Sequence, residues 1–93
     1  MTILGEVMEH VRLVSRMAQA TGTDLVGAYE AGDLTQEAWA EMVRACRGCA
    51  WAGDCGAWLD AHDRVDRAPQ DCPNQARFLD LQALATLRMP EEA

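Results

Sequence analysis

The chain has 93 residues and a formal net charge of −7, from 15 acidic residues against 8 basic ones. A chain of this length makes one small domain, residues 1–93, which buries roughly 60% of its unfolded surface and gains from a stabilising metal or disulfide. The acidic balance excludes unaided binding to nucleic acid and disfavours attachment to anionic membranes.

Helical periodicity dominates the sequence and no segment alternates like a strand, so we predict an all-α bundle of five helices, three of them short. The first helix is expected over residues 3–20, followed by Gly22 as its C-terminal cap. Its apolar stripe comprises Leu4, Val7, Val11, Val14 and Ala18. A second helix is expected over 24–31, with Thr23 as its N-cap and Gly32 as its end.

The third helix has the clearest start, because Thr35 can cap it and Glu37 in its first turn interacts favourably with the helix dipole. It should continue to about Arg47. A fourth helix is expected over 55–63, with Asp54 as its cap.

The fifth helix is expected to begin at Pro73, with Cys72 as its N-cap, and to end at Pro90. Its apolar side comprises Phe78, Leu81, Leu84, Ala85 and Met89. Methionines at helical spacings are expected to fill the core, namely Met8, Met17, Met42 and Met89.

Four cysteines follow the pattern C-x2-C-x5-C-x16-C, at Cys46, Cys49, Cys55 and Cys72. All four lie at predicted helix ends or in loops. Exposed N–H groups at helix N-termini, such as those expected near Cys55 and Cys72, favour thiolates and can bond to cluster sulfurs. No run of about 20 apolar residues could cross a membrane, and the N-terminus lacks the regions of a signal peptide. We therefore expect a cytoplasmic protein whose thiols stay reduced and bind a metal.

The cysteine spacing bears on which metal the site would take. Zinc is often held by two C-x2-C pairs, and only Cys46 and Cys49 form one here. A [4Fe–4S] cluster often takes three cysteines from a compact loop, such as Cys46, Cys49 and Cys55, and the fourth from a remote segment. The spacing favours a [4Fe–4S] cluster on Cys46, Cys49, Cys55 and Cys72, with zinc as the alternative. Buried small side chains and a C-x-x-C redox pair stay open as further interpretations.

A histidine and three tryptophans lie near the cysteines in the sequence. His62 lies seven residues after Cys55 and shares its helix face, so it could replace a ligand or donate a hydrogen bond to sulfur. A solvated histidine at a helix end is the simpler interpretation, and we favour it. Three tryptophans could shield a cluster from solvent or fill the core. They are Trp39, Trp51 and Trp58. Because no acid–base pair or nucleophile constellation stands out, an enzyme is not favoured.

Residues 46–59 contain three cysteines in the pattern C-x2-C-x5-C, followed by Trp58 and Leu59. This segment resembles the core of WhiB-like iron–sulfur regulators, and the same spacing closes the iron–sulfur loop of the endonuclease-III type of DNA glycosylase. Here the fourth cysteine, Cys72, is downstream rather than upstream, and the Gly-Trp-Gly turn and basic tail of WhiB-like proteins are missing. The resemblance therefore implies a cluster but not DNA binding.

A wider set of features runs along most of the chain. It comprises Arg16-Met17-Ala18, Thr23-Asp24-Leu25, Ala31-Gly32-Asp33-Leu34, Trp39, Cys46-Arg47-Gly48-Cys49, Cys55 with Trp58-Leu59, and Cys72-Pro73-Asn74. Together these features resemble small four-cysteine bacterial proteins of an uncharacterised family, a domain of unknown function. The resemblance implies that the four cysteines form one site, and it supplies no activity.

From these observations we expect a role in redox or iron sensing, or in electron transfer, through a protein partner. A partner with a basic patch would fit the acidic surface. The alternative is a zinc-stabilised interaction module with no redox role, in which the metal contributes folding free energy.

Overall fold

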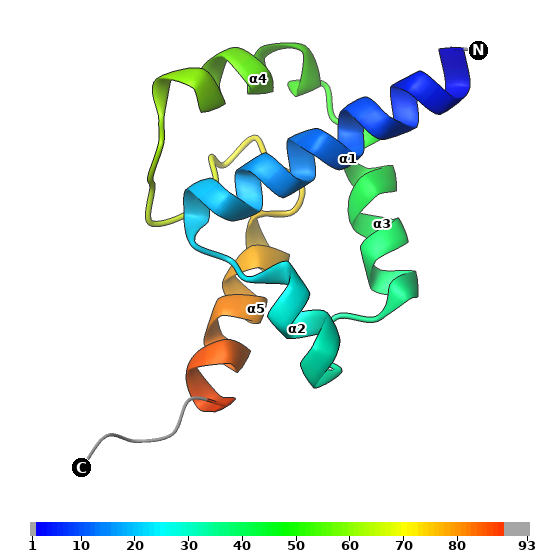
Figure 1. Ribbon diagram of the computed structural model, residues 1–93. Coiled ribbons are helices and arrows are strands. Elements are labelled where there is room, and N and C mark those ends of the chain that lie inside the picture. The colour runs from blue at the N-terminus through cyan, green and yellow to red at the C-terminus, as the bar shows by residue number, and fades with distance from the viewer. Residues whose placement is uncertain (1, 89–93) are drawn as a thin grey trace.

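The computed structural model describes residues 2–88, apart from the side chains of residues 2–6 and of Ala52. Its helices are α1 (Thr2–Thr21), α2 (Leu25–Ala31), α3 (Gln36–Arg47), α4 (Ala52–Ala61) and α5 (Gln75–Arg88). No strand occurs among the described residues, so the prediction of an all-α fold of five helices is confirmed. α1 crosses the molecule and packs against α3 and α4, while α2 packs against α5 (Figure 1).

One apolar core joins the helices. Its largest fully buried side chains are Met17 of α1, Met42 of α3 and Phe78 of α5. Met8 was also expected in the core, but it is 48% exposed because the buried face of α1 lies further along the helix. The predicted core residues Leu4 and Met89 lie outside the described side chains. None of the described helices is long and apolar enough to cross a membrane.

Four helix ends follow the predicted caps, at Gly22, Gly32, Thr35 and Gly48. The hydroxyl of Thr35 accepts the N–H of Ala38 at 3.0 Å, and Gly48 ends α3. Gly22 and Gly32 follow α1 and α2 with φ of 72° and 85°, a left-handed backbone that glycine adopts without steric cost. These positions confirm the stops that the sequence predicted.

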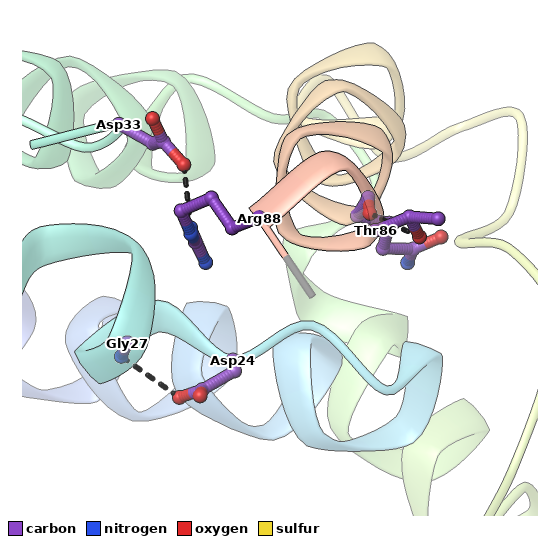
Figure 2. Close-up of polar contacts among 6 residues, drawn as sticks. Asp24, Gly27, Asp33, Thr86 and Arg88 are labelled. Atoms are coloured by element: carbon purple, nitrogen blue, oxygen red, sulfur yellow. Dashed lines mark hydrogen bonds and ion pairs between the residues drawn. The ribbon is translucent and has the colours of Figure 1, made fainter. Parts of the chain in front are cut away.

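The predicted N-cap of α2, Thr23, is wrong. Asp24, not Thr23, accepts the N–H of Gly27 at 2.9 Å, as Figure 2 shows. Thr23 is buried, and its hydroxyl is engaged with Thr21 at 2.8 Å and with the amide of Gln82 at 2.8 Å. Because this network holds the Thr23 side chain in the interior, the next residue takes the capping position.

Two further helix starts differ from the prediction. α4 begins at Ala52 rather than Cys55, because the N–H of Cys55 already bonds to the carbonyl of Trp51. Asp54 therefore lies in the first turn, where its charge suits the helix dipole, but it is not the cap. α4 also ends at Ala61, before the predicted end at Asp63.

α5 begins at Gln75, so Cys72 and Pro73 precede the helix instead of starting it. The N–H of Gln75 bonds to the carbonyl of Cys72 and closes a separate turn. At the other end, Arg88 pairs with Asp33 at 2.6 Å and ties α5 to the segment between α2 and α3 (Figure 2). The predicted stop at Pro90 lies outside the described residues.

The Thr35 cap allows a direct test of the fold. We expect Thr35→Ala to lower the free energy of unfolding by about 1 kcal/mol, since one N–H of the first turn of α3 loses its acceptor. Thr86→Ala is the matched control, because the exposed Thr86 hydroxyl only donates to Gln82 within its own helix. Urea denaturation of both variants checks this, and equal midpoints would contradict the assigned cap.

Candidate metal centre

The four cysteines meet at one cavity of about 20 Å³. Residues far apart in the chain enclose it, because α1 and α5 close over the segments that carry the cysteines. Its other walls are almost entirely apolar and come from Leu13, Val14, Met17, Trp51, Pro73 and Phe78, with Asn74 as the one polar addition. The four predicted site residues therefore share a single pocket whose other walls are almost entirely apolar.

The cysteines fall into two pairs by position. Cys46, in the last turn of α3, and Cys55, in the first turn of α4, are both buried. Cys49 lies between α3 and α4, Cys72 lies before α5, and both are half-buried. The cavity thus has an inner side with thiols held on helices and an outer side with thiols held on loops.

Hydrogen bonds hold the outer side together. The thiol of Cys49 donates to the carbonyl of Asp71 at 3.7 Å, which joins the two loops. The backbone N–H of Asn74 donates to the sulfur of Cys72. The side-chain amide of Asn74, which is 4% exposed, donates to the carbonyl of Met42 at 3.0 Å. Asn74 is therefore a positioning residue that fixes the Cys72 turn against α3.

Sequence reasoning assigned no role to Asn74, because asparagine next to proline is also typical of an ordinary turn. The only signal was its place in the Cys72-Pro73-Asn74 feature of the family resemblance. A contact with a carbonyl of α3 depends on the tertiary structure and has no local pattern.

Burial governs the charge state of the thiols. Burial and, to a smaller extent, the neighbouring Cys55, Cys49 and Cys72 raise the pKa of Cys46 from 9.0 to about 12. Burial, with smaller contributions from Cys72 and Cys49 and an opposing one from Arg16, raises the pKa of Cys55 to about 11. Burial raises the pKa of Cys72, and the backbone N–H of Asn74 partly offsets this rise. The mutual effects show that the four sulfurs lie within electrostatic reach of one another.

These raised pKa values bear on reactivity. Nucleophilic cysteines have lowered pKa values, because the thiolate is the reactive form. Cys46 and Cys55 have the opposite property and stay protonated near neutral pH in the metal-free protein. A cation that replaced the protons would remove the repulsion among the sulfurs, which is the usual chemistry of cysteine metal sites.

Within the part of the chain that the structure describes, no three His, Cys, Asp or Glu side chains are arranged to hold a metal ion as they stand. Four sulfurs on one zinc, each about 2.3 Å from the metal, would lie about 3.8 Å apart. The cysteines surround the cavity without converging in this way. Metal binding therefore requires a local adjustment, and the half-buried Cys49 and Cys72 have the most room for it.

His62 lies outside this cavity. It is exposed at the end of α4, where its Nδ1 lies 2.7 Å from the carbonyl oxygen of Trp58 and its ring stacks on that tryptophan at 4.2 Å. Trp51 lines the cavity and meets Trp58 edge-on at 5.9 Å, whereas Trp39 lies in a separate groove. Of the three tryptophans, Trp51 is thus the one that lines the cysteine cavity, and His62 is a residue at the end of α4 outside it.

The fold and the cavity define a small helical protein with four cysteines around one apolar pocket. The chain belongs to DUF6455, a family of unknown function whose model matches residues 1–84. The predicted membership of an uncharacterised family is confirmed, and the match includes all four cysteines. No curated protein and no solved structure matches the chain, so the local resemblance to WhiB-like regulators stays a prediction.

The thiol pKa values predict a pH dependence for the reduced, metal-free protein. Because the folded pKa of Cys46 is above the unfolded value of 9.0, the contribution of the neutral thiol is complete below pH 9 and is lost as pH rises toward about 12. We expect the urea midpoint to fall over this range. Cys46→Ser removes the thiol at position 46, so the urea midpoint of this variant should fall less over the same pH range. An equal fall in the variant and the wild type would contradict the raised pKa of Cys46.

Asn74→Ala should lower the free energy of unfolding by about 1–3 kcal/mol, since a buried hydrogen bond to the Met42 carbonyl is lost. Gln70→Ala is the control, because it removes an exposed amide from the same loop. Thermal denaturation of the two variants measures the difference. Similar melting temperatures would show that Asn74 does not anchor the turn.

Proposed function

We propose that Cys46, Cys49, Cys55 and Cys72 hold a [4Fe–4S] cluster in a cytoplasmic protein that senses redox state or iron, or transfers electrons, through a protein partner. The observation that carries the proposal is the single cavity lined by all four cysteines, with apolar side chains as almost all of its remaining wall. Apolar surroundings and limited solvent access are the means by which proteins adjust the reduction potential of such clusters.

The donor set of the cavity fits this group. Four thiols are the usual ligands of a [4Fe–4S] cluster, and the N–H of Asn74 supplies a hydrogen bond of the kind that cluster sulfurs accept. The cluster would supply one-electron chemistry, while Leu13, Met17 and Phe78 would exclude water from its inner side.

Zinc is the second candidate, and the size of the cavity favours it. A volume of about 20 Å³ accommodates about one water-sized group, so a single ion needs less widening than a cluster. The protein would then be an interaction module in which zinc contributes folding free energy and takes no part in redox chemistry. An enzyme that uses a cysteine nucleophile is not proposed, because burial raises the pKa values of Cys46 and Cys55.

Purification without oxygen, followed by visible spectroscopy and metal analysis of the same sample, separates the two candidates. A cluster predicts a brown protein with a broad band near roughly 400 nm that changes on reduction, and about four irons per chain. Zinc predicts a colourless protein with about one zinc per chain that unfolds on chelation. A folded protein that binds neither metal would refute both proposals.

Cys72→Ser tests whether the remote cysteine belongs to the site. We expect this variant to lose most of the bound metal and to melt at a clearly lower temperature, because Cys72 connects the turn before α5 to the other three ligands. Ala50→Ser is the matched control, since it places the same hydroxyl in the exposed loop beside Cys49. Metal content equal to that of the control would remove Cys72 from the ligand set.

A further inference from the structure

A second concave feature lies apart from the cysteine cavity. It is an open groove of about 440 Å³ between α1, α2 and α3, and it shares no lining residue with the cavity. α2 contributes Leu25, Val26 and Tyr29, and α3 contributes Trp39. No charged side chain is among the described residues that line it.

The groove leaves large apolar side chains in water. Val26 is 70% exposed and Tyr29 is 56% exposed, while Ala28 is the buried residue of α2. Trp39 packs against the core and forms part of the floor. Aromatic residues in such a position supply contact area with little loss of side-chain entropy, and they are enriched where proteins bind each other.

Carboxylates lie on the elements that form this apolar surface. Glu30 lies four residues after Val26 and so shares its face of α2, Asp24 is the N-cap of α2, and Glu37 lies in the first turn of α3. All three are exposed. With the net charge of −7, this arrangement opposes a second copy of the same chain and favours a positively charged occupant.

We propose that the groove binds an amphipathic helix of another protein, with apolar side chains in the groove and Lys or Arg residues opposite Asp24, Glu30 and Glu37. Helices commonly bind in this way, through apolar residues at helical spacing that enter a hydrophobic groove. The bound helix would rest on α3, which carries Trp39 in the groove and Cys46 at its other end. The proposal does not depend on any metal at the cysteines, so either one can fail without the other.

Synthetic peptides test the proposal on the full chain. One labelled peptide of about 18 residues has a leucine stripe and a lysine face, a second has the same stripe and a glutamate face, and a third has the lysine composition without the stripe. Fluorescence anisotropy should give a micromolar Kd for the first peptide and at least about tenfold weaker binding for the others. No saturable binding of the first peptide, or equal binding of all three, would overturn the proposal.

Variants locate the binding surface. Val26→Glu should weaken binding of the lysine-faced peptide at least about tenfold, and Tyr29→Ser serves as a second variant of the same surface. Leu87→Glu is the matched control, because Leu87 is 81% exposed on α5 and lies outside the groove. Equal weakening by Val26→Glu and Leu87→Glu would show nonspecific binding and overturn the proposal. Self-association of the wild-type chain that Val26→Glu abolishes would assign the groove to a second copy instead.

Discussion

The closure of α1 and α5 over the cysteines is the interaction on which the rest of the structure depends. Cys46 and Cys49 are joined locally, since the N–H of Cys49 bonds to the carbonyl of Cys46 at 3.1 Å, but Cys55 lies on α4 and Cys72 on the loop before α5. Only the tertiary structure brings all four to one cavity. Met17 and Phe78, both almost fully buried, pack into the core and form walls of the same cavity. Burial of apolar surface, the main favourable term in folding, therefore also assembles the thiols.

That closure sets the chemistry of the site. Removing the thiols from water raises the pKa values of Cys46 and Cys55, because a buried thiolate lacks solvation. Cys46 and Cys55 therefore carry neutral thiols near neutral pH, and a metal that bound there would have to replace these protons. Cys49 and Cys72 lie on loops at the outer side of the cavity, so an adjustment of the site there would not require a helix to move.

The two concave surfaces of the molecule have opposite characters. The cysteine cavity is small and lies against the core, whereas the groove over α2 is larger and more open, with exposed carboxylates on the helices that form it. α3 connects them, because Trp39 lines the groove and Cys46 lines the cavity. A protein that exchanges electrons or signals through a partner needs both a reactive centre and a docking surface, and this fold provides candidates for each.

Local chemistry by itself determined the helices and many of their ends. Apolar periodicity together with start and stop signals predicted all five helices. The Thr35 cap and the Gly32 stop followed from hydrogen bonding and backbone freedom within a few residues. The α2 cap was missed because a remote side chain, Gln82, engages the hydroxyl of Thr23. A local sequence pattern cannot show that a residue far away in the chain will form a hydrogen bond with the expected capping side chain.

The same distinction holds for the site. The spacing of the cysteines was enough to nominate Cys46, Cys49, Cys55 and Cys72 as one group. Only the tertiary structure decided that they share an apolar cavity, that Asn74 anchors one of them and that Trp39 lies elsewhere. The sequence specifies which residues are cysteines. The solvation of their thiols and the distances between them depend on contacts between distant segments, which form only when the core has folded.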